Sequence, residues 1–238
     1  MSNIALILGG GSGSRMRQEI PKQFLTINDC PVIIYTLAAF QNHPEIDAIA
    51  VVCLEGWENV LKAYAKQFGI TKLKHIIAGG KNGHESAQNG VYELEKHYKA
   101  DDIVLIHDGN RPLVSAEIIS NCIVTITRYG DCATPVINCT EAMMQTQDDI
   151  TSSSSYPRDN LKRGQTPNGF YLKTVCDLYR RAAIAKIDNS RGPSLLMMQL
   201  GQPIHLFAGS EKNFKLTTIE DIEIFQSLLE VQKPKWLR

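Results

Sequence analysis

The stretch Leu8-Gly9-Gly10-Gly11-Ser12-Gly13-Ser14-Arg15-Met16 directly follows the apolar run from Ile4 to Leu8. A continuous apolar run closed by glycines is typical of a strand buried in a parallel sheet. In open α/β sheets, ligands bind beyond the carboxyl ends of the strands, which is where these glycines lie. Glycine lets the backbone approach a ligand closely and turn its N–H groups toward an anion. The stretch therefore predicts an anion-binding loop at the edge of a parallel sheet.

Two better-known glycine loops do not fit this stretch. A Walker A loop needs Gly-Lys-Ser or Gly-Lys-Thr at its end, and a dinucleotide fingerprint starting at Gly9 needs glycine where Ser14 stands. What remains is a loop with two cations beside it, Arg15 and the Lys22 of Pro21-Lys22-Gln23-Phe24. Those cations suit a triphosphate whose charge increases as pyrophosphate departs. The alternative is a tight turn beside two solvated cations.

Outward from the loop, strand-like and helix-like stretches alternate. Strands are expected at residues 4–8, 46–54, 74–78, 103–107, 132–137 and 204–207. Helices are expected at residues 31–40, 57–68, 85–98, 116–128 and 172–185, and a last helix opens at 217–221, where Thr217 and Glu220 have capping-box spacing. This alternation predicts an α/β fold, Rossmann-like, with a mostly parallel sheet and helices on both faces.

Residues 138–165 break the alternation. They are polar and contain Thr151 followed by four serines, and fewer than 75 residues remain after them. So short a remainder does not fit a second domain with its own core. We therefore expect one domain over residues 1–238 with a protruding arm at about 138–165.

Composition limits the classes of partner. The chain has 25 basic and 25 acidic residues, which argues against nucleic acid or a membrane surface as the main partner. Six cysteines show no metal-binding spacing and read as small buried apolar residues. The N-terminal apolar run is too short for a signal peptide or a membrane span, so the cytoplasm is the expected location.

Five ordered motifs carry a resemblance. They are the glycine loop, Pro21-Lys22-Gln23-Phe24, His107-Asp108-Gly109-Asn110-Arg111-Pro112, Gly164-Gln165-Thr166-Pro167, and Asn213-Phe214-Lys215-Leu216-Thr217-Thr218. Together they resemble the signature of the cytidylyltransferases that act on ribitol 5-phosphate and 2-C-methyl-D-erythritol 4-phosphate, closer to the ribitol-phosphate branch. The resemblance covers nearly the whole chain and implies the nucleotide-diphospho-sugar transferase type of fold.

The resemblance implies a role for each matching residue. Arg15, Lys22 and Lys215 are implied to be catalytic, through charge stabilisation. The implied nucleotide-binding residues are Leu8, Gly9, Gly10, Gly11, Gly13, Gly79, Gly80, Ser86 and Gly109. Ser86 is equally explained as a residue near a helix N-terminus. Because the acceptor phosphate is already anionic, the chemistry needs charge neutralisation and in-line positioning and no strong general base.

Asp108 follows a buried strand, where a carboxylate can hold Mg²⁺. The alternative is a turn-forming Asp before Gly109. Arg111 is implied to orient the substrate or the arm, with a structural salt bridge as the alternative, and His107 is interpreted as structural. Arg158 is implied to reach the polyol phosphate of a neighbouring subunit from the arm, with help from Thr166. The resemblance therefore implies a homodimer with CTP and a polyol phosphate as ligands.

The pattern departs from the family at residues 81–84, 139–142 and 187–193, all on the acceptor side. Arg191 adds a cation where the family carries an acidic residue, which would suit an acceptor with an extra negative group. The leading hypothesis is transfer of CMP to D-ribitol 5-phosphate, for cell-wall or capsule precursors. The alternatives are the 2-C-methyl-D-erythritol 4-phosphate enzyme of isoprenoid synthesis and a nucleotide-binding paralogue without turnover. A nicotinamide dehydrogenase is disfavoured by Ser14 and Lys22.

Overall fold

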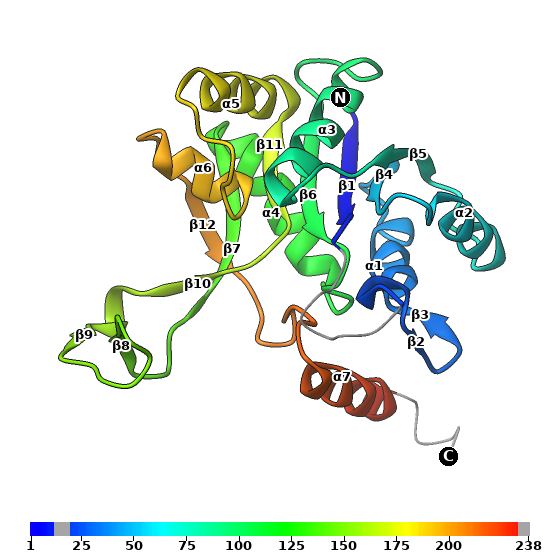
Figure 1. Cartoon of the computed structure of the whole chain (residues 1–238). Helices are drawn as coiled ribbons and strands as arrows, with labels where there is room; N and C mark the ends of the chain where they lie inside the picture. The colour runs from blue at the N-terminus through cyan, green and yellow to red at the C-terminus, as the bar shows by residue number, and fades with distance from the viewer. Residues whose placement is uncertain (12–19, 233–238) are drawn as a thin grey trace.

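The structure is a computed structural model that describes residues 1–11 and 20–232. Its centre is a sheet with the strand order β10-β7-β11-β6-β1-β4-β5, and β12 pairs with β7 (Figure 1). The strands of this sheet are β1 (Asn3–Gly9), β4 (Ala48–Cys53), β5 (Leu73–Ala78), β6 (Ile103–Asp108), β7 (Cys132–Asn138), β10 (Lys162–Gly164), β11 (Asn168–Tyr171) and β12 (His205–Ala208). Strands β5, β4, β1 and β6 pair in parallel, which confirms the mostly parallel sheet.

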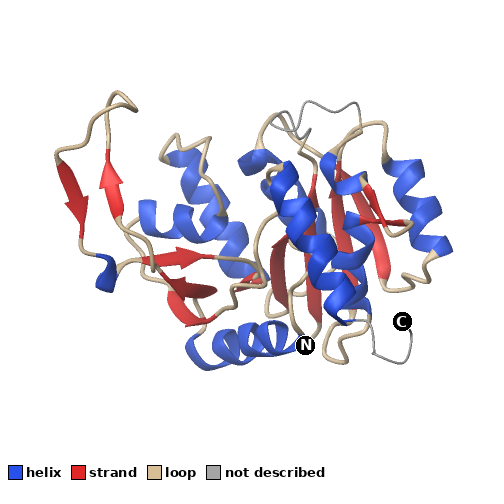
Figure 2. Cartoon of the chain, turned by 90° about the horizontal axis from the view of Figure 1, so that it is seen from below, coloured by secondary structure: helices blue, strands red, loops and turns tan. Residues whose placement is uncertain are grey.

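Helices cover both faces of the sheet (Figure 2). They are α1 (Val32–Gln41), α2 (Glu58–Gln67), α3 (Gly83–Glu95), α4 (Ala116–Tyr129), α5 (Leu172–Ile184), α6 (Pro193–Gln199) and α7 (Ile219–Gln232). Because side chains alternate along a strand, Ala5 and Ile7 of β1 join one core with α1, α2 and α4, while Ile4 and Leu6 join the other with α3, α5 and α6. The chain thus forms three layers, with the sheet in the middle.

The register of the sheet brings four strand ends to one edge. Gly9 of β1 lies beside Cys53 of β4, and Cys53 lies beside Ala78 of β5. On the other side of β1, Leu8 pairs with Asp108 at the end of β6. The segments that follow β1, β5 and β6 therefore start from the same edge, as expected for the carboxyl ends of parallel strands.

The predicted arm is present as a projecting hairpin (Figure 1). Its tip consists of β8 (Met143–Gln145) paired antiparallel with β9 (Ser154–Tyr156). A short 3₁₀ turn, η3 (Arg158–Asn160), leads back to β10, which pairs antiparallel with β7. Residues 140–160 are all exposed. That the arm forms a dimer contact stays a prediction.

Sequence periodicity did not predict several short elements, among them β11, β2 (Thr26–Ile27), β3 (Cys30–Pro31) and α6. Strand β11 inserts antiparallel between β6 and β7, and a small hairpin joins β2 to β3. Helix α6 is a single short segment that begins with Pro193. Each of these segments is too short for a hydrophobic periodicity to be recognised, so its conformation depends on tertiary contacts.

The predicted cap of the last helix is shifted by one residue. Asp221 N donates to Thr218 Oγ1 at 3.3 Å, and the Asp221 carboxylate accepts from Thr218 N at 2.8 Å and Thr217 N at 2.7 Å. The reciprocal box is therefore Thr218 with Asp221, and the expected pair of Thr217 with Glu220 is wrong.

The six cysteines are free thiols, and all except Cys30 are buried, as expected. Burial raises the pKa of Cys132 to about 12 and that of Cys53 to about 11, which makes both thiols poor nucleophiles. Among the residues that the structure describes, none of the helices combines the length and apolarity needed to cross a membrane.

Candidate functional site

Glycines crowd together where β1, β5 and β6 end. A Cβ atom added to Gly10 would lie 3.4 Å from Ser86 Oγ and 3.6 Å from the Cα of Gly79. A Cβ on Gly79 would approach the Cys53 carbonyl oxygen to 3.2 Å, and one on Gly109 would approach the Leu8 carbonyl oxygen to 3.0 Å. These residues follow three separate strands, and a side chain at Gly79 or Gly109 would press against a neighbouring backbone carbonyl. The structure thus brings together most of the predicted nucleotide-binding residues.

Of the residues predicted in and beside the glycine loop, the structure describes Lys22 but not Gly13 or Arg15. Lys22 opens η2 (Lys22–Phe24), a 3₁₀ turn packed against α1, and is half-buried. A Cβ atom added to Gly11 would meet no atom of the described residues within 4 Å.

Gln23, which sequence reasoning did not single out, fixes the start of the glycine loop. Its side chain is 2% exposed, and Nε2 donates to the Gly9 carbonyl at 2.6 Å and the Gly11 carbonyl at 3.0 Å. Both carbonyl oxygens are thereby turned toward Gln23. The only signal in the sequence was its place beside Lys22, because the role depends on a tertiary contact.

Ser86 and Gly80 form one unit at the start of α3. Ser86 Oγ accepts a hydrogen bond from Gly80 N at 2.9 Å. The N-cap of the helix is Asn82, whose side chain accepts from Glu85 N at 2.8 Å. Ser86 therefore does not cap α3, but its hydroxyl, which lies next to Gly10, holds the backbone N–H of Gly80.

Asp108 is the centre of the charged part of the site. Its Oδ1 is 2.9 Å from Lys215 Nζ, and its Oδ2 is 3.0 Å from Arg111 Nε. Burial alone would raise the pKa of this carboxyl, but the charges of Lys215 and Arg111 and their hydrogen bonds outweigh it and hold the pKa well below the usual range. Asp108 is therefore an anion throughout the neutral range. Three residues from two predicted motifs meet here.

The segment that carries Lys215 is fastened to the turn after β6. Leu216 N donates to the Asn110 carbonyl at 2.9 Å, and Arg111 Nη1 donates to the Asn213 carbonyl at 2.7 Å. Asn213 is fully buried, and its Nδ2 donates to the Thr166 carbonyl at 2.8 Å. Asn213 is a second residue that sequence reasoning missed, although it stands in a quoted motif.

Thr166 is engaged inside the protein. Its hydroxyl oxygen accepts from Asp108 N at 3.1 Å and lies 3.0 Å from Nδ1 of His107. His107 has no exposed surface, and burial lowers its pKa to about 4. A neutral ring without access to solvent is no base for a bound ligand, which supports the interpretation of His107 as a structural histidine.

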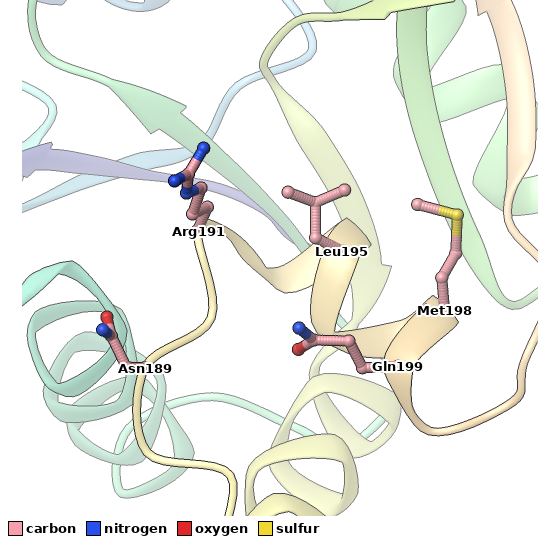
Figure 3. Close-up of a pocket in the computed structure, with 5 residues that line it drawn as sticks. All are labelled: Asn189, Arg191, Leu195, Met198 and Gln199. Carbon is pink, nitrogen blue, oxygen red and sulfur yellow. The ribbon is translucent and has the colours of Figure 1, made fainter. Parts of the chain in front are cut away.

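Arg191 lies at the edge of a cavity of about 440 Å³ lined by Asn189, Arg191, Leu195, Met198 and Gln199. None of these described lining residues is acidic. Figure 3 shows the Arg191 side chain pointing away from Asn189 and Gln199. Its loop is held to the start of α3, where Asn82 Nδ2 donates to the Asp188 carbonyl at 3.1 Å. The loop that carries Arg191 is thus joined to the N-terminal end of α3.

Arg158 is separate from this cluster within the described contacts. It is exposed at the base of the arm, where Nη1 donates to the Thr140 carbonyl at 2.8 Å. Residues 1–11 and 20–232 contain no group of three or more His, Cys, Asp or Glu side chains placed to hold a metal ion. A metal at this site would therefore need ligand atoms from a substrate in addition to Asp108.

A sequence profile of a known family matches residues 3–231, and its description is 2-C-methyl-D-erythritol 4-phosphate cytidylyltransferase (IspD). The chain is 39% identical to a ribitol-5-phosphate cytidylyltransferase of Lacticaseibacillus paracasei, over 94% of this chain and 97% of the relative. It is 32% identical to a 2-C-methyl-D-erythritol 4-phosphate cytidylyltransferase of Clostridium botulinum, over 96% and 97%. A crystal structure of 4-diphosphocytidyl-2C-methyl-D-erythritol synthase superposes with a TM-score of 0.80 at 23% identity, over 96% and 98%.

Proposed function

Because this chain belongs to the IspD family of cytidylyltransferases, which are CTP-dependent nucleotidyltransferases, we propose that it transfers CMP from CTP to D-ribitol 5-phosphate. A phosphate oxygen of the acceptor attacks the α-phosphorus of CTP, and the bond to the β-phosphate breaks. The products are CDP-ribitol and pyrophosphate. The 39% identity to a ribitol-5-phosphate enzyme over nearly the whole chain carries the choice of acceptor.

The geometry supports this chemistry without a general base. The acceptor phosphate is already ionised at neutral pH, so the protein must mainly neutralise charge and hold two phosphates in line. Lys215 and Arg111 are the cations for this, and both are positioned by Asp108 at 2.9 and 3.0 Å. Lys22 and Arg15 would stabilise the negative charge that moves onto pyrophosphate. The glycine loop would bind the triphosphate through its N–H groups.

The residues fit a divalent cation of the Mg²⁺ type. Mg²⁺ commonly takes one or two carboxylates together with substrate phosphates and water. Asp108 supplies one permanently ionised carboxylate at the end of β6, beside Leu8 of β1. We therefore infer that Asp108 would hold the ion together with the phosphates of CTP. When bound, the ion would neutralise phosphate charge and favour departure of pyrophosphate.

The acceptor side of the proposal includes the arm and the α5–α6 loop. Arg158 would bind the polyol phosphate in the site of a second subunit, which makes the working unit a homodimer. Arg191 would bind the acceptor from the side of α3, and a polyol phosphate offers hydroxyls and a charged group to such a cation. The direct part of Thr166 in phosphate binding is the weaker element, because its hydroxyl is already shared by His107 and Asp108.

A pyrophosphate-release assay with CTP tests the proposal. The acceptor panel contains D-ribitol 5-phosphate, 2-C-methyl-D-erythritol 4-phosphate and a polyol phosphate with an extra carboxylate, and UTP and ATP replace CTP in parallel. We expect D-ribitol 5-phosphate with CTP to give at least ten times the kcat/KM of any other pair. Preference for 2-C-methyl-D-erythritol 4-phosphate would move the enzyme to isoprenoid synthesis. Calorimetric CTP binding without turnover of any acceptor would instead indicate a nucleotide-binding paralogue.

A further inference from the structure

His107 is buried directly behind the charged cluster, and the proposed reaction gives it no part. It is the residue before Asp108 on β6 and has no exposed surface. Its Nδ1 is 3.0 Å from Thr166 Oγ1, and its Nε2 is 3.1 Å from the Arg111 carbonyl oxygen. The ring packs edge-on against Phe40 of α1, with centroids 5.1 Å apart. Both ring nitrogens thus have a partner.

The partners decide which nitrogen carries the hydrogen. A carbonyl oxygen can only accept, so Nε2 must donate to Arg111. Thr166 Oγ1 accepts from Asp108 N at 3.1 Å, and its own hydrogen is then free to be donated to Nδ1. The opposite tautomer would set the lone pair of Nε2 against the carbonyl oxygen inside a fully buried space, where an unmade hydrogen bond is unfavourable.

These bonds hold both ends of one turn. Arg111 N donates to the Asp108 carbonyl at 3.1 Å, which closes the turn from Asp108 to Arg111. His107 holds the end of the turn through the Arg111 carbonyl, and it holds the beginning through Thr166 and Asp108 N. Two of the three charged side chains of the cluster, Asp108 and Arg111, start from this turn. A displacement of either end would move the carboxylate that binds Lys215.

We propose that His107 is a positioning residue, fixed as the Nε2–H tautomer, which holds the turn that presents Asp108 and Arg111 to the reacting phosphates. The chemistry it serves rests on the proposed function. The tautomer of His107 does not rest on the proposed function, because it depends only on hydrogen bonds inside the chain.

Nitrogen-15 NMR of the histidine-labelled, ligand-free protein at neutral pH tests the tautomer without turnover. We expect the His107 signals, assigned by their loss in His107→Gln, to show a protonated Nε2 and an unprotonated Nδ1. A protonated Nδ1, or equal mixing of the two tautomers, overturns the proposal. Absence of turnover with every acceptor would contradict the proposed function but would leave this result unchanged.

Two substitutions test separately the two hydrogen bonds of the His107 ring, one to Thr166 and one to the Arg111 carbonyl. In His107→Asn the amide replaces Nδ1 and can still bond to Thr166, and in His107→Gln the amide replaces Nε2 and can still donate to Arg111. We expect each to lower kcat about tenfold, and His107→Phe, which keeps neither bond, about a hundredfold, with the KM for CTP within twofold of the wild type. A purely structural role would not produce this order or this separation of kcat from KM.

The matched control is His43, which is also buried and bonds to Ala116 O and Ser120 Oγ between α1 and α4. His43→Asn should lower the melting temperature without lowering kcat at a temperature where it stays folded. Equal kcat in the three His107 variants and the wild type, measured while folded, contradicts the proposal. The proposal is also contradicted if the loss of kcat in each His107 variant is proportional to its loss of melting temperature and His43→Asn shows the same proportion.

Discussion

At the scale of single residues, Gln23 shows how a buried amide can fix the backbone at the start of the glycine loop. Its Nε2 is the shared donor for the carbonyls of Gly9 and Gly11. Gln23→Glu keeps the shape but replaces this donor with an acceptor, and leaving two carbonyls without a donor costs about 1–3 kcal/mol. We expect the KM for CTP to rise about tenfold or more while the acceptor KM changes little. Steady-state kinetics with both substrates varied measure this.

The control for Gln23 is Gln41→Glu. The Gln41 side chain forms an exposed bond to Thr71, at the opposite end of α1 from the glycine loop. This variant should keep both KM values. If Gln23→Glu has the same KM for CTP as the Gln41 variant, the carbonyls of Gly9 and Gly11 do not set the geometry of the nucleotide loop.

His107 also makes a prediction about acid stability. Burial lowers its pKa in the folded protein to about 4, below the usual 6.5. Between these pH values the unfolded chain binds a proton that the folded chain does not. The stability that the neutral His107 ring contributes to the folded protein is therefore complete above pH 6.5 and is lost as the pH falls toward 4. A difference of about 2.5 between the two pKa values corresponds to about 3 kcal/mol.

Urea unfolding of wild type and His107→Asn at each pH from 7 to 4 measures this loss. We expect the difference in unfolding free energy between the two proteins to shrink by up to about 3 kcal/mol as the pH falls. The carboxylates common to both cancel in the difference. A difference that stays constant over this range would mean that the His107 ring is protonated as easily in the folded protein as in the unfolded chain.

Much of the site could be predicted from the sequence, because motifs after strand ends converge on one edge of a parallel sheet. The glycine loop, Asp108, Arg111 and Lys215 were all predicted, and the structure brings together those that it describes. Gln23 and Asn213 were not, although both stand inside quoted motifs. Their importance lies in contacts with distant backbone carbonyls, and neither spacing nor residue type reports such contacts.

At the scale of elements, long periodic segments were predicted within a few residues of their observed bounds, whereas short ones were missed. Strand β11 has four residues, and its antiparallel place between β6 and β7 follows from pairing partners rather than from its own pattern. The prediction of the N-terminal capping residues of α7 was wrong for another reason. Thr217 and Thr218 precede two acidic residues, so two registers of the capping box fit the sequence, and the structure selects Thr218 with Asp221.

The cap of α7 gives a prediction for this element. Asp221 accepts hydrogen bonds from two main-chain N–H groups directly after the segment that carries Lys215. We expect Asp221→Ala to lower the unfolding free energy by about 1–2 kcal/mol, which is typical of a lost N-terminal cap. Urea unfolding measures the change, and substitution of Glu223, an exposed acidic residue two positions further along α7, by Ala should change it by less than about 0.5 kcal/mol. Equal effects of the two substitutions would rule out the shifted box.

At the scale of the whole molecule, the arm leaves apolar side chains in solvent. Met143, Met144, Ile150 and Tyr156 are 42%, 67%, 86% and 52% exposed. A two-stranded hairpin of this size is marginally stable alone, so a contact with a second subunit would account for both its composition and its order. Arg158 stands at its base and is not joined to the Asp108 cluster by the described contacts. A site completed by the arm of a second subunit, as proposed above, would account for this separation.

Mixing two inactive variants tests that arrangement. Arg158→Ala removes the proposed contribution to the neighbouring site, and Lys215→Ala removes a residue of the subunit's own site. In a symmetric dimer, a mixed pair then contains one site that has both residues. When equal amounts of the two variants are unfolded together and refolded, about half of all dimers should be mixed. Because each mixed dimer has one intact site of two, activity should recover to about a quarter of the wild type.

The control is the same experiment with Lys215→Ala and Arg111→Ala, whose residues lie in one cluster of the same subunit. A mixed dimer of this pair has no intact site and should recover no activity, while light scattering should give twice the 26.5 kDa of one chain in both mixtures. If Arg158→Ala and Lys215→Ala likewise recover nothing although mixed dimers form, Arg158 serves its own subunit. A mass of one chain in both mixtures would rule out the dimer itself.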